Sequence, residues 1–247
     1  MGQNDQDANW AMSSQSRTVS VDAFWMDETE ITNGEYKQFV NWVVDSIARE
    51  RLSEVDETYK IFQDKNGNEL DKPVLNYKKK IAWDKPTEDQ KMALDSMFYQ
   101  GEDKIDFMPE MNSSLLMYKY AWVDYIQAAQ KENKFDPLLG RYNRSIEGLG
   151  KTKDSADVMI KKDTSIYNEN GEIQNITVYR ELKNRSDFIS QKRVNIYPDT
   201  LCWIRDYTYA YNEPYMILYF SHPGYGEYPV VGVSCEQAQA FFHWRSY

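Results

Sequence analysis

Few residues in this chain have the type and spacing that catalysis or metal binding requires. Its two cysteines, Cys202 and Cys235, lie far apart, and only two histidines, His222 and His243, are present. The sequence contains no CxxC pair, glycine-rich phosphate loop, nucleophile elbow or HExxH motif. Neither a zinc site nor a disulfide framework is indicated, and no residue is nominated as a catalytic group.

Cys235 is the cysteine with the more distinctive position, because it opens a predicted helix. The dipole at a helix N-terminus could lower the pKa of its thiol and make it reactive. Its largely apolar neighbours favour burial instead, and His243 lies more than two helical turns away. We therefore expect Cys235 to be a buried structural residue.

Three carboxylates precede the first predicted helix: Asp27, Glu28 and Glu30. Such an oxygen cluster could bind calcium or take part in acid–base chemistry. Acidic residues just ahead of a helix are also favoured by its dipole and by solvent, and we prefer this structural interpretation. No metal or other cofactor is expected.

The overall composition describes an acidic globular chain. Of its 247 residues 41% are hydrophobic, enough for a core, and the formal net charge is −10. Negative charge repels a phosphate backbone, so nucleic acid is a poor candidate partner. No apolar run reaches the ~20 residues that cross a bilayer, and residues 1–20 contain no apolar leader segment.

Three predicted helices begin at capping boxes, in which a hydroxyl side chain and a Glu or Gln three residues later cap each other's backbone N–H. The first helix extends to about Leu52 with one apolar face, the second is short, and the third carries Ala238, Phe241 and Phe242 on one face. The boxes are Thr32 with Glu35, Thr87 with Gln90, and Ser234 with Gln237.

A longer helix is predicted from about Ser114 to Glu132. Tyr118, Trp122 and Ile126 recur there at four-residue steps, which is helical spacing. Together with the short helix after Thr87, it is our candidate for an inserted helical subdomain.

Strands are predicted where apolar and polar residues alternate. After a flexible arm at residues 1–17, the segment from Thr18 to Met26 is expected to be a strand entering a core. Residues 64–67 give a tight-turn signal, and the turn signal at residues 167–171 predicts a β-hairpin. From Tyr197 onward sheet is expected, with two alternating sets: Leu201, Trp203, Tyr207, Tyr209 and Tyr211, then Met216, Leu218 and Phe220.

Aromatic residues make up 15% of the chain, and they are common in both cores and interfaces. Core packing is the preferred explanation, while a sugar-stacking row or a protein contact is the alternative. The candidate partner-binding residues are Tyr118, Trp122, Tyr179, Trp203, Tyr207 and Tyr209.

Two segments near the ends of the chain carry recurring motif residues. The first set is Phe24, Glu30, Thr32, Asn33, Tyr36 and Phe39, and the second is Pro229, Val230, Val233, Ser234, Ala238, Phe241 and Trp244. Together they resemble the formylglycine-generating-enzyme (sulfatase-modifying factor) family. The resemblance implies an α+β fold of the C-type-lectin-like kind, incomplete at its C-terminus. Residues 18–247 would form the domain, and residues 53–196 a mixed helical and hairpin insertion.

Two departures from the family pattern bear on activity. Cys235 stands where the family has tryptophan, and Phe242 stands where it has cysteine. The family's copper-binding cysteines are expected beyond Tyr247, so the resemblance implies a non-catalytic chain. One alternative is a sulfatase-modifying oxidase whose catalytic half follows Tyr247. Another is a sugar-binding module that uses Trp203, Tyr207 and Tyr209.

Residues 46–52 and 197–234 are similar to one branch of this family, the gliding-motility lipoproteins of the type IX secretion system. That similarity implies a structural, periplasmic protein held to the outer membrane by an N-terminal lipid, whose cysteine is not in this sequence. It also implies self-association in a large ring and a GldN/PorN-like partner protein.

Overall fold

The computed structural model describes residues 18–21, 23–104, 109–144, 159–168, 172–205, 209 and 211–246. The chain divides into two compact units, Met1–Glu30 and Ile31–Tyr247. In the first unit, the described residues form no helix or strand, and Phe24, Trp25 and Met26 are exposed. The predicted strand from Thr18 is therefore wrong. Alternation gives a strand propensity, but a strand also needs a neighbour for its backbone hydrogen bonds. The predicted arm at residues 1–17 lies outside the described residues.

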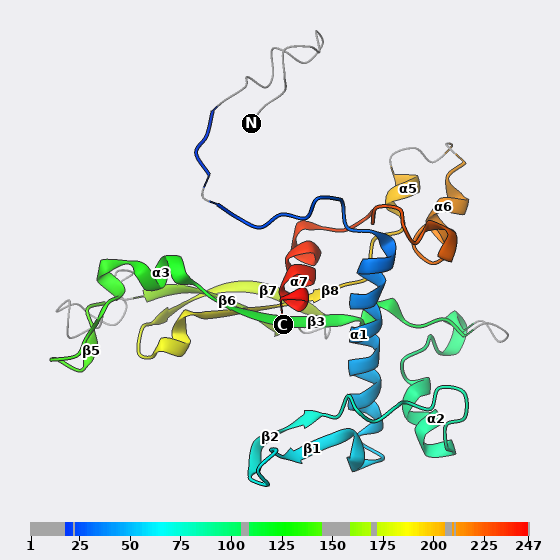
Figure 1. Ribbon diagram of the computed structural model, residues 1–247, viewed down its shortest axis with the longest axis horizontal. Helices are drawn as coiled ribbons and strands as arrows, with labels where there is room; N and C mark the ends of the chain where they lie inside the picture. Colours follow the sequence, from blue (N-terminus) through cyan, green and yellow to red (C-terminus); the bar gives the residue numbers. More distant parts are fainter. Residues whose placement is uncertain are drawn as a thin grey trace. The chain divides into compact units, whose positions relative to one another are not determined.

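The second unit is a mixed α+β structure (Figure 1). The α-helices in its described part are α1 (Asn33–Leu52), α2 (Glu88–Asp95), α3 (Tyr125–Ala129), α5 (Cys202–Arg205), α6 (Glu213–Leu218) and α7 (Cys235–Arg245). Single 3₁₀ turns occur at Glu57–Tyr59, Gly101–Asp103, Ser113–Leu115, Lys131–Asn133, Arg185–Phe188 and Pro223–Tyr225.

The described strands form two-stranded antiparallel sheets. In these sheets, β1 (Lys60–Gln63) pairs with β2 (Glu69–Leu75), β3 (Met117–Val123) with β8 (Ile189–Asn195), β4 (Phe135–Asp136) with β5 (Arg141–Tyr142), and β6 (Met159–Tyr167) with β7 (Ile173–Glu181). The prediction of an α+β fold is confirmed at this level.

All three predicted capping boxes are present, at the starts of α1, α2 and α7. In the last, the Ser234 N–H donates to the Gln237 side chain at 2.7 Å, and the Gln237 N–H donates to the Ser234 hydroxyl at 3.2 Å. The tight turn predicted at residues 64–67 is confirmed, and it joins β1 to β2. The hairpin predicted around residues 167–171 is confirmed by the β6–β7 pair, although residues 169–171 of its turn lie outside the described residues.

The helix predicted from Ser114 to Glu132 is wrong. Residues 117–123 form β3, and only the short α3 follows it, capped by Asp124. Tyr118 and Trp122 fit a helical stripe, but with Tyr120 they also recur at steps of two, and their aromatic side chains favour the strand. The deciding partner is β8, where Tyr120 lies opposite Lys192.

The sheet predicted after Tyr197 is also wrong where the structure describes it. Trp203 lies in α5, and Met216 and Leu218 lie in α6. Pro214 lies in the first turn of α6, where its missing N–H and fixed φ angle suit a helix. Residues 206–208 and 210, including Tyr207, lie outside the described residues.

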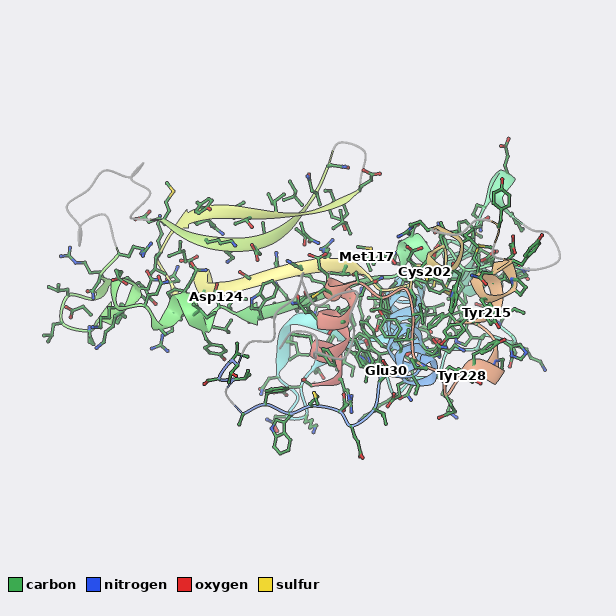
Figure 2. All side chains as sticks on the ribbon, turned by 90° about the horizontal axis from the view of Figure 1, so that it is seen from above. Glu30, Met117, Asp124, Cys202, Tyr215 and Tyr228 are labelled. Carbon is green, nitrogen blue, oxygen red and sulfur yellow. The ribbon has the colours of Figure 1, made fainter. Side chains whose placement is uncertain are left out.

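Strands β8 and β6 lie side by side without a backbone ladder between them. The Ser190 hydroxyl accepts from the Asp163 N–H at 3.1 Å, and the Ser165 hydroxyl accepts from the Arg193 N–H at 2.9 Å. The contacts advance along both strands in the same direction, so β8 and β6 run parallel. In Figure 2 the β6–β7 hairpin lies on the opposite side of β8 from β3.

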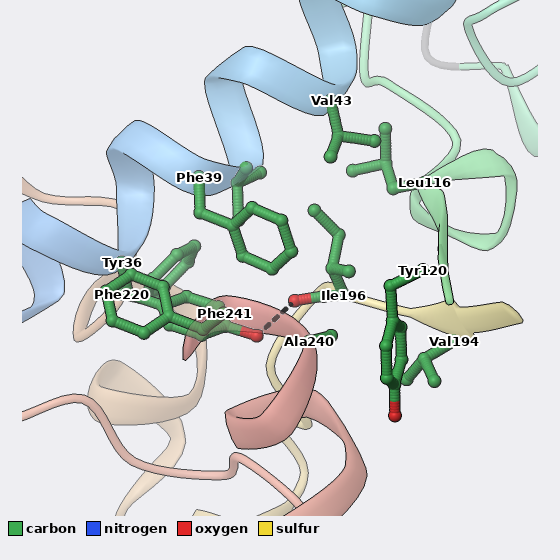
Figure 3. Packing of buried hydrophobic residues seen from close by; sticks show 11 residues of the cluster. Tyr36, Phe39, Val43, Leu116, Tyr120, Val194, Ile196, Phe220, Ala240 and Phe241 are labelled. Atoms are coloured by element: carbon green, nitrogen blue, oxygen red, sulfur yellow. Dashed lines mark hydrogen bonds between the residues drawn. The ribbon is translucent and has the colours of Figure 1, made fainter. Parts of the chain in front are cut away.

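Helix α1 contributes to two adjacent hydrophobic clusters. Its first half packs with β3, β8 and α7, and Figure 3 shows the buried residues of this cluster. Its second half, with Ala48 and Leu52, packs against Tyr59, Leu94 and Met97. A third cluster lies elsewhere in the unit and contains Tyr142, Ile160, Leu182 and Phe188.

Candidate functional site

The two motif segments identified from the sequence lie against each other. Thr32 forms a β-bridge with Pro229, and the Val230 N–H donates to the Ile31 carbonyl at 2.9 Å. At the start of α1, the Asn33 N–H donates to the Tyr228 carbonyl at 2.8 Å. The first N–H group of the helix therefore finds its partner just before the second segment, and the β-bridge beside it fixes the two segments in register.

Asn33 is the polar centre of this junction and is fully buried. Its side-chain amide donates to the carbonyls of Tyr225, at 2.9 Å, and Tyr219, at 3.2 Å. Its carbonyl oxygen has no partner among the described residues. Asn33 thus ties α1 to the loop that precedes the second motif.

Aromatic rings fill the space between α1 and α7. Tyr36 stacks on Phe241 at a centroid distance of 5.5 Å, and Phe39 contacts both Phe241 and Trp244, at 5.9 and 5.3 Å. The Tyr36 hydroxyl donates to the Ile196 carbonyl at 2.8 Å, the dashed line in Figure 3. Burial raises the pKa of the Tyr36 phenol far above its ordinary value, so this group is a neutral structural donor.

His243 connects α7 to β3. Its Nε2 lies 2.8 Å from the Ala121 carbonyl, which can only accept, so Nε2 carries the proton. In the neutral ring Nδ1 is then the acceptor, and it lies 3.4 Å from the Tyr118 hydroxyl. The ring therefore covers part of the open edge of β3.

An aromatic groove of about 650 Å³ opens beside this junction. Its apolar walls include Trp42, Trp83 and Trp244, with Phe98 and Met111. Gln38, Asn41 and Asp45 of α1 supply polar groups along it. Rings beside amides and a carboxylate can hold an aromatic or basic side chain of another protein, or a sugar ring.

The remaining chemistry-bearing residues do not converge. Cys235 is exposed, so the expectation that it is buried is wrong: it lies in the first turn of α7 and outside the face formed by Gln237, Ala240 and Phe241. Burial raises the pKa of the Cys202 thiol, which lowers its thiolate fraction. Among the described residues, no group of three His, Cys, Asp or Glu side chains is placed to hold a metal ion.

Five of the six predicted partner-binding residues are described, and they do not form one surface. Tyr118 and Trp122 are half-buried in ring contacts, with Phe39 and with Tyr120 respectively. Trp203 is also half-buried, and it stacks on Tyr215 at 5.2 Å. The exposed members are Tyr179 on β7 and Tyr209, while Tyr207 lies outside the described residues.

None of the groove residues was predicted from the sequence to bind a partner. Gln38, Asn41 and Asp45 recur at three- and four-residue steps, which marks a polar stripe beside the apolar face of α1. Trp83 and Phe98 lie outside the helices and strands, and their approach to Trp244 depends on tertiary packing that spacing does not encode.

Comparison with known proteins gives no family: no family model, curated protein or solved structure matches this chain. Within the part of the chain that the structure describes, no helix is long and apolar enough to cross a membrane.

Proposed function

We propose that this chain is a non-catalytic structural component of the type IX protein secretion and gliding-motility machinery, of the GldK/PorK kind. In this role it is a periplasmic protein at the outer membrane, held there by an N-terminal lipid. It assembles into a large ring and binds a GldN/PorN-like protein.

The observation that carries the proposal is the pairing of the two motif segments. About 190 residues separate Phe39 from Pro229, yet the segments share a β-bridge, backbone hydrogen bonds and stacked rings. Because the residues behind the family resemblance make these contacts, they support a common platform of the formylglycine-generating-enzyme type, with the intervening residues as an insertion.

The aromatic groove supplies the surface for a partner in this proposal. Interfaces are enriched in exposed Trp, Tyr, Phe and Met at their centres. The chain's net charge of −10 favours a partner with basic groups.

The test is a crosslinked purification of the native protein from its source membranes, followed by imaging and identification of the bound proteins. We expect a large ring that contains a second, stoichiometric protein. Recovery of monomers alone would remove the scaffold role.

Asn41→Arg tests whether the groove is the contact. Asn41 is exposed and lines the groove, and its side chain makes no hydrogen bond to any described residue. We therefore expect the fold to persist while partner recovery falls about tenfold. The matched control is Asn66→Arg in the exposed β1–β2 turn, which adds the same charge away from the groove. Equal recovery of partner by both variants would place the contact elsewhere.

A sugar-binding module is the second candidate, and the groove's aromatic walls beside Asn41 and Asp45 are the observation that favours it. A glycan screen of the purified chain tests it. Binding that is lost on Trp83→Ala would point to the groove, and loss on Trp203→Ala would point to the α5 region. A screen without any binding removes the candidate.

A further inference from the structure

Strand β7 has one edge that pairs with β6 and one that does not. The Asn168 N–H donates to the Glu172 carbonyl at 2.9 Å and closes the hairpin, so hydrogen-bonded pairs alternate from there along the register. Gln174, Ile176, Val178 and Arg180 therefore bond to β6. The residues between them turn their N–H and C=O groups outward: Ile173, Asn175, Thr177, Tyr179 and Glu181.

Several of the equivalent outward groups of β6 have side-chain partners. Gln127 bonds to both the N–H and the carbonyl of Lys161, at 3.0 and 2.7 Å, and Ser190 accepts from the Asp163 N–H. Arg144 donates to the Met159 carbonyl at 3.1 Å. No described residue makes a corresponding bond to the outer edge of β7.

This open edge lacks the usual features that prevent strand pairing. β7 pairs with β6 over nine consecutive positions without a bulge, and it contains no proline. Its only charged residues, Arg180 and Glu181, lie at one end. A long, regular and mostly uncharged edge presents a template for another extended strand.

The sequence of β7 is compatible with itself in antiparallel register. With Thr177 opposite Thr177 of a second copy, Val178 faces Ile176 and Tyr179 faces Asn175. Arg180 then faces Gln174, and Glu181 faces Ile173, so no like charges are opposed. The outward groups of the odd-numbered residues become the hydrogen-bonded pairs of this new ladder.

We propose that β7 pairs with β7 of a second copy of this chain, about a two-fold axis at Thr177. Charge distribution favours this occupant. The chain carries −10 overall, but β6 and β7 together have three basic residues and two acidic ones, so two copies meet at a nearly neutral position. The inference rests on the strand edge and is independent of the proposed function.

Tyr179→Pro tests the ladder in the full-length chain. The Tyr179 N–H points outward, so proline leaves the hairpin bonds intact but removes two bonds between copies, one in each direction. Sedimentation velocity over a concentration series should show a reversible dimer whose dissociation constant rises about 30-fold in the variant. Tyr179→Ala, which keeps the N–H, is the control and should change the dissociation constant far less.

Thr177→Cys tests the register in a Cys235→Ser background, which removes the exposed native thiol. Directly opposed residues of a hydrogen-bonded pair lie ~5.5 Å apart at Cα, within disulfide range. Mild oxidation should therefore join two copies through residue 177. Gln174→Cys in the same background should stay uncrosslinked, because its two copies would lie roughly 20 Å apart.

A chain that remains monomeric at all concentrations would overturn the proposal. So would a dimer that Tyr179→Pro leaves unchanged, or equal crosslinking by the two cysteine variants. If Tyr179→Pro unfolds the hairpin, circular dichroism will reveal it, and the cysteine pair then decides the question.

Discussion

At the scale of single residues, the side chain of Asn33 ties the start of α1 to the loop that precedes the second motif segment. Asn33→Ala leaves two carbonyls of the 219–225 region without their donor in a buried site, and we expect a loss of about 3 kcal/mol in the free energy of unfolding. Urea denaturation measures it. Asn66→Ala, in an exposed turn, should stay within about 0.5 kcal/mol of the parent. A comparable loss in both variants would mean that the amide of Asn33 does not hold the junction.

Asp56 gives the chain a pH-dependent contribution to stability. Hydrogen bonds from Lys79 and Thr58 lower the pKa of its carboxyl from 3.8 to about 2. Because the folded-state pKa is depressed, the stabilisation is complete above pH 3.8 and is lost as the pH falls toward 2. Asp56→Asn lacks this ionisation. The difference in free energy of unfolding between parent and variant should therefore become smaller as the pH falls from 3.8 to 2. A gap that is constant from pH 5 to pH 2 would contradict the assignment.

At the scale of elements, the capping boxes of α2 and α7 offer a matched comparison. Gln237 caps α7 and is nearly buried, and its amide also donates to the carbonyls of Asn195 and Tyr197, at 3.0 and 2.9 Å. Within the described part of the chain, the hydrogen bonds of the Gln90 side chain are the capping contacts of α2. Gln237→Ala should therefore lower the free energy of unfolding by about 2 to 3 kcal/mol, and Gln90→Ala should lower it by about 1 kcal/mol or less. Thermal or urea unfolding distinguishes the two, and equal losses would show that the bonds to β8 and Tyr197 add nothing.

The elements that could be predicted from the sequence are those with local signals. The box of Thr32 and Glu35 and the turn at residues 64–67 are each complete within a few residues, and both formed as expected. β3 was missed because its pairing partner β8 follows about 70 residues later. The groove was missed for the same reason, since Trp83 and Trp244 meet only in the folded chain.

At the scale of the whole molecule, the apolar face of α1 is covered in part by α7, which lies near the other end of the chain. Phe39 of α1 packs on Phe241 and Trp244 of α7, and about 200 residues separate them in the sequence. The cluster around Phe39 also includes β3 and β8, so none of its α1 residues reaches its final environment through local contacts alone.

This separation delays the packing of α1 during synthesis of the chain. A ribosome adds roughly 5 to 20 residues each second, so the apolar face of α1 waits about 10 to 40 s for α7 to be made. During that time the face has no native cover from α7, and aggregation or chaperone capture competes with folding. A truncated translation product that ends before Ser234 would retain α1 and its capping box but would never enclose Phe39.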